Sequence, residues 1–161
     1  MRQELTTDTV ERYIEASPEA LYDFIADVTR TPERTPDIVR CEWLDGATGP
    51  AVDARFRGHV KRNGRGPTYW TTCTVTECGP GESFFFAVST GKSGKSTVNT
   101  WGYRLAPTEG GGTDVTESFQ LTANLGTKIY WALAGKARGR TNENGMRTTL
   151  ERIKAEVERP A

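Results

Sequence analysis

The segment from Ala137 to Glu158 constrains the fold most, because it carries the pattern of one long amphipathic helix. Its apolar residues recur with a 3.6-residue period and form a single stripe: Met146, Leu150, Ile153 and Val157. Towards the start of the segment the same face carries Gly139, Asn142 and Glu143 instead. A helix that is apolar at one end and polar at the other can cover a sheet and leave a partly polar gap beneath it. The alternative is an ordinary amphipathic helix that seals a core.

Strand patterns fill most of the remaining sequence, and turn signals such as Asn63-Gly64 and Gly79-Pro80-Gly81 separate them. We predict about seven strands: Thr7–Glu15, Ile38–Leu44, Val52–Arg62, Thr68–Cys78, Ser83–Ser89, Thr97–Leu105 and Thr113–Thr122. Strands that follow one another at such short spacing form an antiparallel meander.

Short helices are expected on either side of this meander. Ser17 is a good N-cap and Pro18 fits the first helical position, so a helix should run from there to about Val28. One helical turn is expected within Thr31–Asp37, and a short helix within Leu125–Ala134. Helices that are separated from a run of strands predict an α+β fold with the long helix on one face of the sheet. We expect one domain over residues 1–161.

The composition limits the classes of protein to which this chain can belong. Lys+Arg and Asp+Glu both number 21, and a formal charge near zero argues against a general nucleic-acid binder. No apolar run is long enough to span a bilayer, so no stable membrane insertion is expected. The first residues lack the hydrophobic core of a signal peptide, which favours a cytoplasmic protein. The three cysteines show no Cys-x-x-Cys spacing and are expected to be reduced.

Motifs for nucleotide, metal or nucleophile chemistry are weak. Ser89–Ser96 approaches a phosphate-binding loop, but it lacks the first glycine and precedes a strand pattern rather than a helix. His59 is the only histidine, which excludes a multi-histidine zinc site. Strand alternation places His59 among Arg55, Arg57 and Lys61, on a solvated basic face that could attract an anionic partner. We therefore expect no metal and no cofactor.

One carboxylate falls on an apolar strand face. Alternation groups Glu117 with Val115, Phe119 and Leu121. A buried carboxylate without a partner costs several kcal/mol or takes up a proton. Glu117 therefore either makes a structural hydrogen bond to a neighbouring strand or faces a ligand cavity.

The order of these segments carries a resemblance that covers nearly the whole chain. A first strand, the helix signal Ser-Pro-Glu-Ala-Leu-Tyr-Asp-Phe-Ile-Ala-Asp, a six-strand meander and a long C-terminal helix follow one another. The segments concerned are Ala16–Asp27, Arg40–Leu44, Gly49-Pro50, Ala54–Gly58, Trp70–Glu77, Trp101–Leu105, Gly112–Ser118 and Met146–Glu156. This arrangement resembles the START/Bet v 1-like superfamily, and within it the bacterial polyketide cyclase/dehydrase and lipid-transport group called SRPBCC. The resemblance implies a helix-grip fold, in which a curved antiparallel sheet wraps the long helix and encloses a cavity for an apolar or amphipathic molecule.

Pattern and resemblance together predict which residues wall this cavity. They are Phe24, Trp43, Phe56, Trp70, Phe84, Phe86, Trp101, Tyr103, Glu117, Phe119, Asn142 and Met146. Mostly apolar walls with a few polar groups are typical of small-molecule sites. The same aromatic residues could instead fill an ordinary core. For Trp70 the alternation is ambiguous, because Cys73 and Val75 have the opposite parity on the same strand.

Three kinds of function remain open, because this superfamily contains binding proteins, carriers and enzymes. The first is binding of a small hydrophobic or amphipathic molecule, lipid-like or polyketide-like, by a monomer or homodimer. The second is a cyclase/aromatase-type enzyme with Glu117 or Asp37 as acid or base and Tyr103 as a further candidate. Relatives often carry an aromatic or acidic segment after the first helix, and Asp37 stands in its place here. The third is a protein-interaction module that uses the basic strand face.

Overall fold

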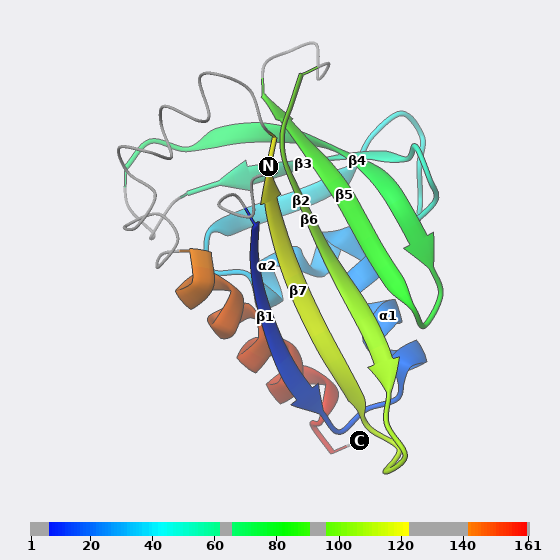
Figure 1. The fold of residues 1–161 in the computed structure, drawn as a ribbon. Coiled ribbons are helices and arrows are strands. Elements are labelled where there is room, and N and C mark those ends of the chain that lie inside the picture. The colour runs from blue at the N-terminus through cyan, green and yellow to red at the C-terminus, as the bar shows by residue number, and fades with distance from the viewer. Residues whose placement is uncertain (1–6, 62–65, 91–95, 123–141, 161) are drawn as a thin grey trace, which may run out of the picture.

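The computed structural model describes residues 7–61, 66–90, 96–122 and 142–160, and a seven-stranded antiparallel sheet forms its centre (Figure 1). The strands are β1 Thr7–Ile14, β2 Ile38–Trp43, β3 Arg55–Val60, β4 Tyr69–Gly79, β5 Ser83–Thr90, β6 Ser96–Pro107 and β7 Thr113–Leu121. Their order in the sheet is β1-β7-β6-β5-β4-β3-β2, so the first strand joins the last strand of a continuous meander. The sheet is curved and the helices lie on one of its faces, which confirms the predicted α+β helix-grip fold.

The chain after β1 forms three short helical elements. Helix α1, Pro18–Ala26, begins as predicted, because the Ser17 hydroxyl oxygen accepts a hydrogen bond of 3.2 Å from the Ala20 amide. It ends before the predicted Val28, since Asp27 has an extended backbone. A 3-10 turn, η2 (Val28–Arg30), and helix α2 (Thr31–Arg34) follow directly, and α2 confirms the predicted helical turn.

Residues 142–157 form the described part of the C-terminal helix. Its predicted apolar stripe is buried against the sheet, with Met146 and Leu150 each 1% exposed and Ile153 fully buried. Burial of a Leu or Ile side chain stabilises the fold by about 1.5–3 kcal/mol, so this stripe fixes the helix on the sheet. Three predictions lie at least partly outside the described residues: the helix start at residues 137–141, the short helix Leu125–Ala134 and the Asn63-Gly64 hairpin.

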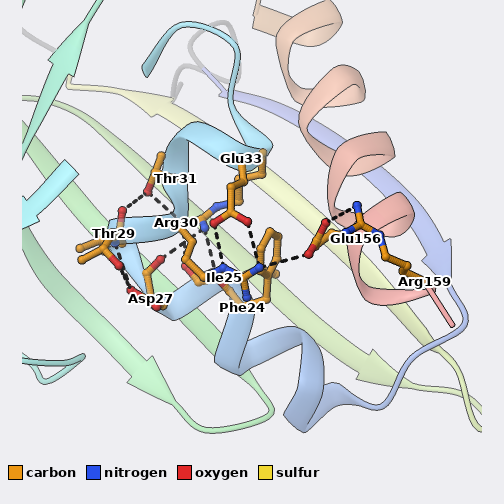
Figure 2. A network of polar contacts seen from close by, with 11 residues as sticks. Phe24, Ile25, Asp27, Thr29, Arg30, Thr31, Glu33, Glu156 and Arg159 are labelled. Carbon is orange, nitrogen blue, oxygen red and sulfur yellow. Dashed lines mark hydrogen bonds and ion pairs between the residues drawn. The ribbon is translucent and has the colours of Figure 1, made fainter. Parts of the chain in front are cut away.

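Ion pairs hold the C-terminal helix against both flanking elements. Figure 2 shows Arg30, which donates to Glu33 at 2.8 Å and reaches Glu156 of the C-terminal helix at 3.2 Å. On the other side Arg12 of β1 contacts Glu151 at 2.6 Å. Exposed ion pairs of this kind contribute about 1 kcal/mol or less each, so they orient the helix while the apolar stripe supplies most of its stability.

The start of β3 differs from the predicted start, and the start of β6 bears on the stretch that approaches a phosphate-binding loop. β3 begins at Arg55 rather than at the predicted Val52, because Asp53 adopts a positive φ of 70°, which no strand accommodates. The stretch that approaches a phosphate-binding loop lies partly outside the described residues, at 91–95. The segment after it is strand β6, as predicted, and offers no helix N-terminus to a phosphate.

Candidate functional site

A cavity of about 210 Å³ lies between the inner face of the sheet and the helices. Among the described residues its wall includes Val28 and Arg34 from the short helical elements and Met146 from the C-terminal helix. The sheet supplies the remaining wall through inward-facing side chains of β2 to β7. This space lies where the first described turns of the C-terminal helix cross the sheet.

Aromatic rings from neighbouring strands make up much of the apolar wall. Phe56 of β3 and Phe86 of β5 meet edge-to-face with their centroids 5.2 Å apart. Trp101 and Phe119 are direct cross-strand partners on β6 and β7, and their rings lie 4.8 Å apart. Rings at these separations present both faces and edges to a bound molecule, which suits offset or edge contacts with a flat ligand.

A carboxyl–phenol pair occupies the inner face of β6 and β7. Tyr103 and Glu117 are direct partners in the register, and the Tyr103 hydroxyl donates to Glu117 Oε1 at 3.2 Å. Both residues line the cavity, and their exposed fractions are only 5% and 3%. Burial raises the pKa of Glu117 to about 8, although the Tyr103 hydrogen bond and the nearby Arg34 charge both act to lower it. At neutral pH the Glu117 carboxyl is therefore mostly protonated, and its Oε2 has no hydrogen-bond partner.

Arg34 is the charged residue that the sequence reasoning missed. It closes α2, is 3% exposed, and folds back onto the end of α1, where it donates to the Phe24 carbonyl at 3.1 Å and the Ile25 carbonyl at 2.7 Å. The free carbonyls of a helix C-terminus carry partial negative charge, which stabilises a buried guanidinium there. Arg34 lies eight residues beyond the end of α1, so no local sequence signal linked it to these carbonyls. Its Nε has no partner, and Arg34 lines the same cavity as Glu117.

Two amides add further polar groups to the wall. Asn142, on the first described turn of the C-terminal helix, is 7% exposed and contacts the Asp8 carboxyl, and this hydrogen bond counteracts the rise in the Asp8 pKa that burial causes. The Asn99 Oδ1 atom on β6 has no hydrogen-bond partner. Asn99 was not among the predicted residues, although it shares the strand parity of Trp101 and Tyr103, and that parity was the available signal.

Two buried thiols complete the wall and add no charge to it. Cys41 of β2 and Cys73 of β4 both line the cavity and are free, in agreement with the expected reduced state. Burial raises the pKa of Cys73 to about 12 and that of Cys41 above its ordinary value. Neutral thiols with such pKa values are poor nucleophiles, so these cysteines serve as small apolar wall groups.

The structure brings together most of the residues predicted for the site. The predicted residues that line the cavity are Asp37, Phe56, Phe86, Trp101, Tyr103, Glu117, Phe119, Asn142 and Met146. Phe24 and Phe84 do not line it, because they pack in the closed core beneath α1 with exposed fractions of 3% and 1%. Trp43 also lies away from the cavity, half-buried with its ring edge-to-face against Phe56 at 5.6 Å.

Trp70 is the clearest correction, since it lies on the outer face of the sheet. Its ring stacks on His59 at 4.5 Å, lies 4.3 Å below the Arg57 guanidinium, and is 42% exposed. The buried Cys73 sets the parity of β4, so Trp70 must face outward. This is the basic face predicted around His59, but its arginines are already engaged, with Arg57 paired to Glu42.

A curved antiparallel sheet that encloses a cavity under a C-terminal helix defines the START/Bet v 1-like class of proteins. The sequence matches the model of the family described as polyketide cyclase / dehydrase and lipid transport over residues 6–158, and the chain belongs to this family. It is thus a bacterial-type SRPBCC protein. No curated protein matches the sequence. Within the described residues, no helix combines the length and apolarity that crossing a membrane requires.

Solved structures agree with this assignment. A polyketide cyclase-like protein from Corynebacterium glutamicum is 28% identical, with a TM-score of 0.63 and coverage of 98% of this chain and 96% of that one. A START superfamily protein from Mycobacterium smegmatis has the same fold with a TM-score of 0.73 at 15% identity, covering 95% and 97%. The di-domain ARO/CYC protein StfQ of the steffimycin biosynthetic pathway is similar with a TM-score of 0.69 at 16% identity; the match covers 95% of this chain and 50% of StfQ.

Proposed function

We propose that this protein binds a small hydrophobic or amphipathic molecule, lipid-like or polyketide-like, in the cavity between the sheet and the C-terminal helix. The observation that carries the proposal is a cavity of about 210 Å³ with aromatic walls and buried polar side chains. Transfer of apolar surface from water into such a space is worth about 25 cal/mol per Å², which is the main driving force available to a ligand. The similarity to a polyketide cyclase-like protein supports the same class of ligand.

A fluorescence titration with a neutral two-ring probe, 1-aminonaphthalene, tests this proposal. Gly58 lies on the inner face of β3, and a Cβ there would sit 3.4 Å from Cys41 Sγ, so a first added carbon fits and a longer side chain must enter the cavity. We expect saturable binding by the wild type and at least about tenfold weaker binding by Gly58→Leu. Thr72→Leu is the matched control, because Thr72 has outward parity on β4. Equal binding by all three proteins would place the probe outside the cavity and contradict the proposal.

A second candidate function is proton-transfer catalysis of the cyclase kind. It is favoured by Glu117, a cavity carboxyl whose pKa is raised to about 8 and which is oriented by Tyr103. A general base is most effective when its pKa lies near the working pH. Asp37 also lines the cavity but is half-buried and lies directly before β2, where its carbonyl accepts a hydrogen bond from the Lys61 amide, so Glu117 is the stronger candidate.

Hydrogen–deuterium exchange distinguishes this second function from binding alone. Benzoylacetone carries an acidic C–H between two carbonyl groups, and NMR follows its exchange in heavy water without knowledge of the natural substrate. If Glu117 is a base, the wild type should accelerate the exchange, and the rate should rise with pH through about 8 as the carboxylate forms. Glu117→Gln should abolish this acceleration. Equal rates for the two proteins across this pH range would leave binding as the only function supported.

A further inference from the structure

We propose that the ligand of this cavity is a compact, uncharged molecule of one or two rings, with a polar end that both donates and accepts hydrogen bonds. This inference rests on the proposed binding function and names the ligand chemistry that the residues of this chain select. Three features support it: the size of the cavity, the unpartnered polar atoms on its wall, and the loss of hydration that a carboxylate meets inside it.

The size of the cavity and its aromatic walls favour a short, flat ligand. An apolar protein cavity of about 150 Å³ holds one benzene ring. The cavity here has about 210 Å³, which is room for a second fused ring or a substituent but not for an extended acyl chain. The edge-to-face pair Phe56–Phe86 and the tilted pair Trp101–Phe119 give this space aromatic walls. Flat rings gain offset and edge contacts against such walls that a flexible chain does not make.

Unpartnered polar atoms on the wall define what the polar end of the ligand must offer. The donors are Arg34 Nε and the Glu117 carboxyl, which is protonated at neutral pH and whose Oε2 is unpartnered, and the acceptor is Asn99 Oδ1. All three residues line this one cavity. Buried polar atoms in native proteins are nearly always hydrogen-bonded, so three unpartnered atoms on one cavity wall indicate a missing partner with both donor and acceptor capacity. A hydroxyl group, or a hydroxyl beside a carbonyl, has that capacity.

The surroundings of Glu117 show that this cavity disfavours a negative charge. Its pKa rises to about 8 even though Tyr103 donates to it and Arg34 lies close enough to lower that pKa. A ligand carboxylate in the same surroundings would meet the same loss of hydration. Arg34 offers little compensation, because its two Nη atoms already donate to the carbonyls of Phe24 and Ile25. An uncharged polar end therefore fits the cavity better than the carboxylate of a fatty acid.

A set of four probes with equal numbers of carbon atoms tests size, polarity and charge separately. Naphthylmethanol is the predicted type; methylnaphthalene lacks the polar end, naphthoate carries a charge, and undecanol has the hydroxyl on a flexible chain. Affinities are measured by equilibrium dialysis of the full chain at pH 7. We expect naphthylmethanol to bind at least about tenfold more tightly than each of the other three.

Two glutamate variants show whether the wall groups produce this preference. Glu117→Met removes the carboxyl but keeps a side chain of similar length, so it should reduce the preference for naphthylmethanol over methylnaphthalene to about threefold or less. Glu11→Met makes the same change on exposed β1 and should leave the preference intact. Equal or tighter binding of any of the three comparison probes would overturn this inference and leave the binding function standing. Failure of all four probes to bind would overturn the proposed function as well.

Discussion

Replacement of Glu117 by glutamine should change how the stability of the protein depends on pH. Glu117 is 3% exposed, accepts one hydrogen bond from Tyr103, and has a second oxygen without a partner. Burial raises its pKa from the ordinary 4.5 to about 8. Between these two values the folded protein holds a proton that the unfolded chain has released. The free energy of unfolding must therefore fall as the pH rises through this window. Glutamine has the same shape and never ionises, so it removes the effect.

The size of the effect follows from the two pKa values. Each pH unit between them is worth about 1.4 kcal/mol, so ionisation of Glu117 costs the folded state on the order of 5 kcal/mol above pH 8. A domain of this size has a total stability of about 5–15 kcal/mol, so the change is large enough to measure accurately. The advantage of Glu117→Gln over the wild type should be smallest near pH 5, grow with pH, and level off above about pH 8.

Urea denaturation of both proteins at several values between pH 5 and pH 9 measures this difference directly. The difference between wild type and variant isolates Glu117, because every other titrating group is common to both. Glu11→Gln provides the control, since Glu11 is exposed on β1, and its curve should run parallel to that of the wild type. A difference between wild type and Glu117→Gln that stays constant across this pH range would refute the reasoning, because it would mean that Glu117 ionises as freely when folded as when unfolded.

Three further predictions concern stability and the cavity. A Cβ at Gly102 would lie 1.9 Å from the Phe85 ring, so Gly102→Ala should lower the free energy of unfolding by about 1–3 kcal/mol in urea denaturation, whereas Gly110→Ala, with nothing within 4 Å, should not. Arg34→Met should lower the free energy of unfolding by about 3 kcal/mol, because it removes the hydrogen bonds to the carbonyls at the end of α1. Arg34→Lys should not restore this stability, because one ammonium group cannot replace the planar guanidinium. Gly145→Ala should raise helix stability by up to about 1 kcal/mol and, because Gly145 lines the cavity, weaken binding of 1-aminonaphthalene; unchanged binding would contradict its place in the wall.

The elements of the fold could be predicted from the sequence because their signals are local. The stripe Met146, Leu150 and Ile153 has the period of a helix, and the same residues are buried in the structure. Turn residues allowed most strand ends to be predicted to within a few positions. The boundary at Asp53 was missed because its positive φ of 70° is unusual for a residue other than glycine and has no clear sequence signature.

The site could be predicted only where strand alternation was unambiguous. Glu117 lies between buried Val115 and Phe119 on one parity of β7, and the structure places it in the cavity wall. Trp70 was assigned to the wrong face because a large aromatic residue suggests burial, whereas here Arg57 and His59 cover its ring on the outer face. Arg34 was missed because its burial depends on the geometry of the α1 end, which is a tertiary feature that periodicity does not encode.

The C-terminal helix contributes to the closed core and to the cavity at different places along its length. Its second half buries Leu150 and Ile153 in a closed core, where a shorter side chain would leave a destabilising void. Its first half carries Asn142 and Gly145, which are too polar or too small to fill the space above the sheet, and the cavity lies there. Substitutions on the first half can therefore reshape the cavity while the second half keeps the helix in place. Such a division lets the shape of the cavity vary on one scaffold without a change of fold.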